Sequence, residues 1–292
     1  MKYKNIFPLL LLVSILSFGA CSFTPNSDES SDPLDSSAVS NNDMPSELVR
    51  LVKDKIGEYL INVQDGYLEL STVAEGNTLL GTSDLTKLTV DGGEEKSVLE
   101  TTGAGVGCIM LASGGTLVLK NLKIQDSSPK GTYDGKGDSY LAFGGKLRFE
   151  NCQITDSIYL KSDAEAEFIN CTFDAPDASR YGVWMADGSA SFNGCTFTGM
   201  RALKIHEKDG EDVVNVTIEN CEFVEIIEKP GIAIGTVDAD TEVAVKYCEF
   251  LWCAEWDHNG SLEGVQSVYE SDTATESFLF TLTGNTVNGV SL

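Results

Sequence analysis

Basic residues are scarce in this chain of 292 residues. Twenty lysines and arginines stand against 45 aspartates and glutamates, which gives a formal net charge of −25. Such a surface repels phosphate backbones, so we expect no nucleic-acid partner. It also repels polyanionic sugars, unless a local basic patch reverses the field.

Metal and nucleotide motifs are also missing. The chain has two histidines, no CxxC pair and no glycine-rich phosphate loop, so we expect neither a zinc centre nor any other cofactor. Calcium is the one open alternative, because stacked carboxylates could hold it, although aspartate is also an ordinary turn former. The aspartates concerned recur at similar positions of a repeat: Asp163, Asp187, Asp209, Asp238 and Asp272.

Long apolar runs are missing except at the start. Lys2 and Lys4 precede an apolar run from residue 6 to residue 18, which is typical of an export signal over residues 1–20 and too short to span a bilayer. Gly19, Ala20 and Cys21 follow, and this junction resembles a bacterial lipobox. The resemblance implies that Cys21 is lipidated and anchors the chain on the extracytoplasmic side of a bacterial cell envelope. Plain secretion with an incidental cysteine is the alternative.

Large apolar side chains are nearly absent from residues 21–43, which favours a flexible acidic tether. Residues 44–79 are assigned to an N-terminal cap region. Apolar residues at 48, 52, 56 and 59/60 have helical spacing behind Ser46, which predicts a short helix covering the open end of the fold. The alternative is an early strand over residues 59–63.

Proline is scarce, with seven residues, whereas glycine is common, with 28, which suits many short strands and tight turns. A short motif recurs: an alternating strand, a bend that is usually Asn plus one residue, then Cys, a polar residue and Phe or Ile. Its copies lie at 117–124, 147–154, 166–173, 190–197, 216–223, 243–250 and 280–287. The cysteines at 152, 171, 195, 221 and 248 are spaced by 19, 24, 26 and 27 residues, which fits one turn of a β-solenoid per copy.

The residues at the bend support this interpretation. Asn170 suits a left-handed backbone, and Gly194 or Gly284 fills the same position where Asn is absent. Tyr247 departs from this rule. The cysteine after the bend is predicted to be a small, inward-facing hydrophobe.

A third short strand precedes each motif, at 157–161, 181–186, 202–207 and 230–235. Three strands per coil and an asparagine corner resemble the pectin-lyase-like right-handed parallel β-helices. The resemblance implies an all-β, single-domain right-handed parallel β-helix over residues 80–292, with about seven to eight coils. It says little about activity, since many functions share that scaffold.

Seven cysteines remain after Cys21. In-register neighbours of a parallel stack rarely offer the torsion of a disulfide, so we expect a buried ladder of free thiols. Cys248 and Cys253 could pair locally across a loop, and Cys108 is expected in the core.

Alternation along the third strand predicts an outward row of Tyr159, Trp184 and Lys204, continuing through Ala233 and Gln266. Three basic residues lie at the entrance to these strands, and a long loop adds two tryptophans and His258. Aromatic rings stack on sugars and guanidinium groups bind carboxylates, which predicts a ligand-binding face. The same side chains could instead serve structural pairing. The basic residues are Arg180, Arg201 and Lys229, and the tryptophans are Trp252 and Trp256.

No complete catalytic set appears in the sequence. Hydrolysis would need two carboxylates facing one groove, and the outward row supplies no such pair. We therefore expect a monomeric, non-catalytic module that binds a glycan or a surface protein. The alternative is a polysaccharide lyase acting on uronate-containing glycans, with Lys204 and Arg201 as its catalytic pair.

Overall fold

The computed structural model describes residues 46–292, except for 64–65, 72–76, 103–107, 127–140, 162, 176–180, 200, 207–212, 227–229, 236, 254–267 and 272–277. The predicted signal, the lipidation site Cys21 and the tether over residues 21–43 therefore lie outside the described residues.

One short helix, α1 (Glu47–Val52), precedes the strands. The Ser46 hydroxyl oxygen accepts a hydrogen bond from the Val49 amide at 3.4 Å, as expected of an N-cap. Leu48 and Val52 are fully buried in the main core. The helical spacing beyond Val52 was misleading, because Ile56 is 69% exposed and residues 57–62 form a strand. That the helix serves as a cap stays a prediction.

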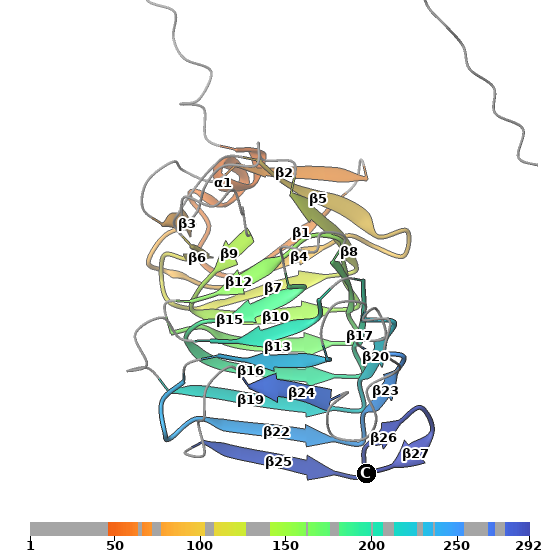
Figure 1. Cartoon of the computed structure of the whole chain (residues 1–292). Coiled ribbons are helices and arrows are strands. Elements are labelled where there is room, and N and C mark those ends of the chain that lie inside the picture. Colours follow the sequence, from red (N-terminus) through yellow and green to blue (C-terminus); the bar gives the residue numbers. More distant parts are fainter. Residues whose placement is uncertain are drawn as a thin grey trace, which may run out of the picture. The chain divides into compact units, whose positions relative to one another are not determined.

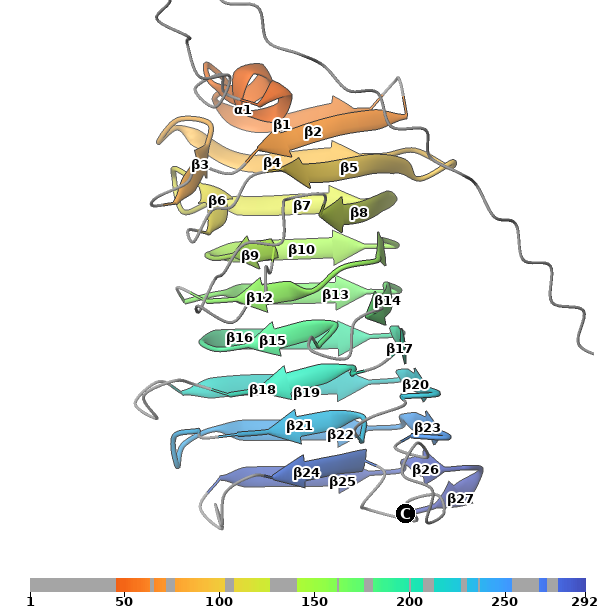
Figure 2. The same cartoon turned by 45° about the horizontal axis from the view of Figure 1, so that its top comes forward.

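In the described residues, strands form three long sheets that run along the solenoid (Figures 1 and 2). Sheet A contains β1 (Gly57–Asn62), β4 (Leu85–Asp91), β7 (Thr116–Lys120), β10 (Lys146–Glu150), β13 (Glu165–Ile169), β16 (Gly188–Asn193), β19 (Val214–Glu219), β22 (Glu242–Lys246) and β25 (Leu279–Thr283). Sheet B contains β2 (Tyr67–Ser71), β5 (Ser97–Thr102), β8 (Leu122–Asp126), β11 (Gln153–Ile154), β14 (Thr172–Ala175), β17 (Thr196–Gly199), β20 (Glu222–Val224), β23 (Glu249–Leu251), β26 (Thr286–Val287) and β27 (Val290–Ser291). Sheet C contains β3 (Thr78–Leu80), β6 (Ile109–Leu111), β9 (Leu141–Phe143), β12 (Ile158–Leu160), β15 (Val183–Met185), β18 (Leu203–Ile205), β21 (Ile232–Ile234) and β24 (Tyr269–Ser271).

The chain visits the three sheets in turn, so each coil contributes one strand to each sheet. Neighbouring strands are parallel, apart from β26 and β27, which are antiparallel. The coil count differs from the expected seven to eight, because the sheets hold nine, ten and eight strands in the described residues. One added strand in each sheet comes from β1 to β3, which lie almost wholly within the range 44–79 assigned to a cap, and the tenth strand of sheet B is β27 at the other end.

The bend between sheets A and B is left-handed, as the sequence predicts. Asn170 has φ 52°, Gly194 has φ 65° and Tyr247 adopts the same conformation at φ 55° despite its large side chain. The asparagines also form a ladder: the Asn151 side-chain amide donates to Asn121 at 2.8 Å, and Asn121 donates to Asp91 at 2.9 Å. At these bends the side-chain amide is thereby satisfied by the bend of the preceding coil.

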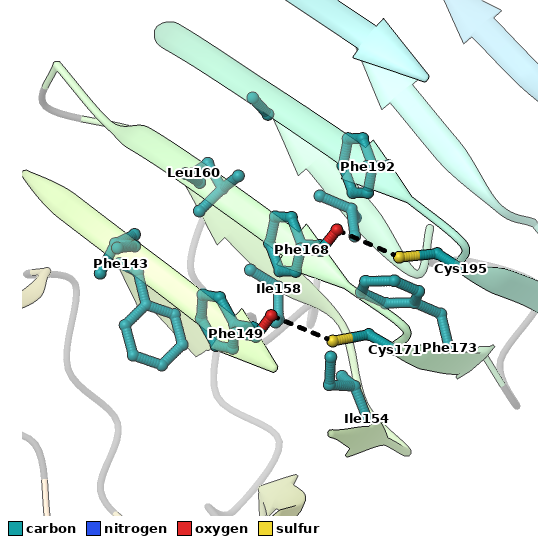
Figure 3. Close-up of a cluster of buried hydrophobic side chains, with 14 of the residues drawn as sticks. Phe143, Phe149, Ile154, Ile158, Leu160, Phe168, Cys171, Phe173, Phe192 and Cys195 are labelled. Carbon is teal, nitrogen blue, oxygen red and sulfur yellow. Dashed lines mark hydrogen bonds between the residues drawn. The ribbon is translucent and has the colours of Figure 1, made fainter. Parts of the chain in front are cut away.

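The core consists of side chains stacked coil upon coil (Figure 3). Phe168 and Phe192 have ring centroids 4.8 Å apart at an interplanar angle of 3°, and Phe173 and Phe197 stack at 4.6 Å and 7°. These distances match the spacing of neighbouring strands, so the parallel register alone sets the stacking.

The cysteines of the repeat are buried thiols outside any disulfide, as predicted, and no disulfide joins Cys248 to Cys253. Four of these thiols, those of Cys152, Cys171, Cys195 and Cys248, lie near a carbonyl of the preceding coil. The Cys171 thiol donates to the Phe149 carbonyl at 3.5 Å, and the Cys195 thiol donates to that of Phe168 (Figure 3). The hydrogen bond with the Cys171 thiol raises the pKa of the Cys195 thiol to about 12; the Cys221 thiol opposes this rise and burial adds to it. This thiol therefore stays protonated at neutral pH and is a poor nucleophile.

Candidate functional site

The outward face of sheet C carries the predicted row. In the strand register Tyr159 pairs with Trp184, Trp184 with Lys204, and Lys204 with Ala233. The flanking residues Val183, Met185, Leu203 and Ile205 are fully buried in the main core, so the row lies on the opposite side of the sheet. In the strand register Ala233 pairs with Glu270 of β24, and Gln266 lies outside the described residues.

Tyr159 lies in the outward row, as the alternation predicts, but neighbouring side chains cover it almost completely. Its side chain is only 9% exposed and belongs to a second, smaller apolar cluster on the outer side of sheet C. Cys108, Ala142 and Ala186 are buried in the same cluster, with Met110 and Trp184 packed against it. Cys108 is therefore buried as expected, but outside the main core. Tyr159 supports the neighbouring tryptophan instead of presenting its own ring to a ligand.

Trp184 is half-buried and fixed on several sides. Its ring centroid lies 5.1 Å from that of Tyr159, and its indole N–H donates to the His206 carbonyl at 3.0 Å. The Lys204 ammonium lies 4.7 Å from the centre of the Trp184 ring, which is a cation–π distance. The tryptophan is thus held in one orientation by residues from the next coil.

The sequence reasoning missed Tyr181, which gathers the cations of this face. The Arg201 guanidinium carbon and the Lys204 ammonium lie 5.4 and 5.6 Å from the centre of its ring. Tyr181 precedes β15, which begins at Val183, and its side chain is only 6% exposed, so its ring supports the two cations and presents little surface of its own. Lys161 was also missed; its ammonium lies 5.8 Å from the ring centre of Tyr159.

His206 packs at the end of the row. Its ring centroid lies 6.1 Å from that of Trp184. A Cβ on Gly235 would lie 2.1 Å from the His206 Nδ1 atom, so the next coil needs glycine at this position to admit the imidazole. We call the set Tyr181, Trp184, Arg201, Lys204 and His206 the cationic-aromatic face.

The structure does not bring all the predicted site residues together. Arg180, Lys229 and Trp256 lie outside the described residues. Trp252 is 51% exposed, but it follows β23 in sheet B, whereas Trp184 lies in sheet C. Its amide donates to the Asn288 side chain at 2.9 Å, which ties it to the final turn of the solenoid.

A second concave surface, on sheet A, was also missed by the sequence reasoning. It is an open groove of about 550 Å³ over β7, β10, β13, β16 and β19. Charged pairs flank it, such as Lys146 with Glu165 at 3.7 Å. Its floor carries small polar side chains and no aromatic ring: Thr116, Ser189, Ser191, Asn215 and Thr217.

Within the described part of the chain, no group of three or more His, Cys, Asp or Glu residues is arranged to hold a metal ion. Asp187 of the expected aspartate series accepts a hydrogen bond from the Asp163 amide at 2.7 Å, which is a turn contact. The described residues also contain no helix long and apolar enough to cross a membrane.

The parallel three-sheet coil and its asparagine corner agree with the comparison to known families. A family model described as "Right handed beta helix region" matches residues 107–290. The chain belongs to this family. No curated protein and no solved structure matches it. The more specific pectin-lyase-like relationship stays a prediction.

Because many activities share this fold, the activity of this β-helix depends on the side chains at its surface. The cationic-aromatic face brings together the Trp184 ring, the Lys204 ammonium and the Arg201 guanidinium from two neighbouring coils. Those groups can stack on a sugar ring and pair with its carboxylate.

Proposed function

We propose that this chain is a lipid-anchored β-helix of a bacterial cell envelope, and that its cationic-aromatic face binds an acidic, uronate-containing glycan without transforming it. Cys21 would carry the lipid, and residues 21–43 would tether the solenoid to the membrane.

One observation carries the binding proposal. Arg201 and Lys204 lie over the same Tyr181 ring, and Lys204 also lies over Trp184, in a chain whose formal net charge is −25. A cluster of cations on a strongly acidic protein creates the local reversal of field that an anionic sugar needs.

A glycan fits this face better than a peptide does. The Trp184 ring is held half-exposed by its indole hydrogen bond and by Tyr159, so little conformational entropy is lost when a flat sugar stacks on it. The neighbouring cations would then select sugars that carry carboxylates over neutral sugars.

The test is binding of the full chain to a panel of uronate-containing polysaccharides, with neutral polysaccharides of similar length alongside. Trp184→Ala and Arg201→Ala are each expected to weaken uronate binding by about tenfold or more. Lys87→Ala is the matched control, because this partly exposed lysine lies on sheet A and should leave binding unchanged. If both site variants bind like wild type, the proposed face is wrong. Binding to a surface protein alone would replace the glycan proposal.

A polysaccharide lyase is the second candidate, favoured by the approach of Arg201 and Lys204 to one ring. In a lyase mechanism Lys204, in its neutral form, would take the proton from the carbon next to a uronate carboxylate held by Arg201. A carbon–carbon double bond would then form as the bond to the glycosidic oxygen on the adjacent carbon breaks and that oxygen leaves with a proton. Incubation with the same polysaccharides separates the candidates, since a lyase generates unsaturated products that absorb in the ultraviolet. Turnover abolished by Lys204→Ala would favour the lyase, and binding without any product favours the module.

The anchor is tested separately. Cys21→Ala should move the protein from the membrane fraction to the soluble fraction and abolish incorporation of a labelled fatty acid. Unchanged fractionation would exclude Cys21 as the anchor.

A further inference from the structure

The last strand of sheet A presents an open edge. Among the described residues β25 pairs with β22 on one side, and no strand pairs with its other side (Figure 1). An open edge offers a row of backbone donors and acceptors to a further strand.

This edge lacks the charged side chains that the preceding coil carries at the paired positions. Where the preceding coil has Glu242, Lys246 and Glu249, the register places Leu279, Thr283 and Thr286. No charged side chain occurs from residue 278 to residue 292, in a chain of which 22% of the residues are charged. Exposed edges are usually protected by charged residues or proline, so this edge lacks the common protection against pairing.

The inward side chains of β25 are also incompletely covered. Phe280 and Leu282 are only partly buried, whereas Val243 and Val245, their counterparts in β22, are 1% and 0% exposed. Leu279 is 53% exposed and Val290 is 70% exposed. The core of the solenoid therefore reaches solvent at this end, and covering it would remove apolar surface from water.

The opposite end has a different character. Helix α1 packs there against the first coil, with Leu48 and Val52 fully buried (Figure 2). Head-to-tail stacking of copies would have to displace this helix. Two copies can instead meet at their equal β25 edges, which gives a closed pair about a twofold axis.

We propose that two copies of this chain associate end to end through β25, whose edges pair as antiparallel strands. The twofold axis passes near Thr281, the middle residue of the strand. A second copy is the occupant that the charges favour, because each chain carries −25 and the uncharged strand β25 is an edge where two such chains meet without opposing like charges. The pairing is independent of the glycan proposal and replaces the monomer expected from the sequence.

Cross-linking tests the pairing in the full chain purified in detergent. Thr281→Cys places a thiol at the proposed axis, and Thr217→Cys is the matched control, since it occupies the same column of sheet A two strands away. The described native cysteines are at most 2% exposed and should add little background. With a short bis-maleimide, Thr281→Cys should give about tenfold more covalent dimer than Thr217→Cys. Equal cross-linking of the two variants would overturn the proposal.

Sedimentation tests the association without a cross-link. The wild-type chain should shift from monomer to dimer as concentration rises, and the double variant Thr281→Lys, Thr283→Lys should weaken the dimer by about tenfold or more, because like charges then face one another. Thr217→Lys should dimerise like wild type, and all three proteins should unfold at similar temperatures. A wild-type chain that stays monomeric over the whole range, or lysine variants that dimerise normally, would refute the pairing.

Discussion

Aromatic residues occur on both sides of the strands, and the two populations behave differently. Inside the solenoid, Phe149, Phe168 and Phe192 stack nearly parallel, at interplanar angles of 14° and 3°. Outside sheet C, Tyr159 and Trp184 meet at 58°, with a lysine over the tryptophan. The inner rings repeat with the coil because parallel register superimposes equal positions. The outer rings differ from coil to coil, so their arrangement is specific to a few residues and can encode recognition.

The largest expected effect comes from removing an inner ring. Phe192→Ala deletes a side chain that is 1% exposed and stacked between two coils. We expect a loss of about 3–5 kcal/mol in the free energy of unfolding, measured by urea denaturation. A loss below about 1 kcal/mol would mean that the stack is not a tightly packed core.

The second-largest effect on stability is expected at the bend between sheets A and B, which joins the two inner phenylalanine stacks. Asn170 turns the chain between Phe168 and Phe173 with φ 52°. Asn170→Ala should cost about 1–2 kcal/mol, because a Cβ without a local hydrogen-bonding group is disfavoured in this conformation. Asn170→Gly should cost much less, since glycine adopts positive φ freely. If the two variants unfold at the same denaturant concentration, the backbone conformation is not what selects asparagine.

An outer ring should matter less for stability than an inner one. Trp184→Ala removes a half-buried side chain together with one cation–π contact, for which we expect a loss of about 1 kcal/mol in unfolding free energy. The same variant should lose glycan binding. A destabilisation as large as that of Phe192→Ala would erase the distinction between the two populations and make Trp184 a structural residue.

The start of the asparagine ladder should show the smallest effect, and only in acid. Partial burial opposes ionisation of Asp91, but the hydrogen bonds from Asn121 and the Gly93 amide, together with Lys120, hold its pKa below the ordinary 3.8. A lowered folded-state pKa stabilises the fold above pH 3.8, and this contribution is lost as pH falls through the folded value. Wild type should therefore lose stability relative to Asp91→Asn in that acid range. Asp84→Asn, at an exposed turn, is the control, and identical acid profiles for all three proteins would exclude the linkage.

Much of the coil could be predicted because its determinants are local and repeated. Asn170 and Gly194 mark a left-handed bend in any context, and a period of two assigns Trp184 and Lys204 to one side of their strands. The same reasoning failed where a sequence pattern was extended beyond the end of the helix or strand that it describes. The helical spacing was extended past Val52 into a strand, and the third strand expected over residues 181–186 covers only Val183–Met185.

The sequence by itself determined the β-helix, the corner asparagines, the buried free thiols and the outward row, because each follows from a residue's own backbone preference or from strict alternation. Only the tertiary structure decided that Tyr159 is covered while Trp184 remains half-exposed, and that Arg201 and Lys204 meet over Tyr181. Those facts depend on which side chains neighbouring coils bring together, and residues about twenty positions apart in the chain carry no local signal of that contact.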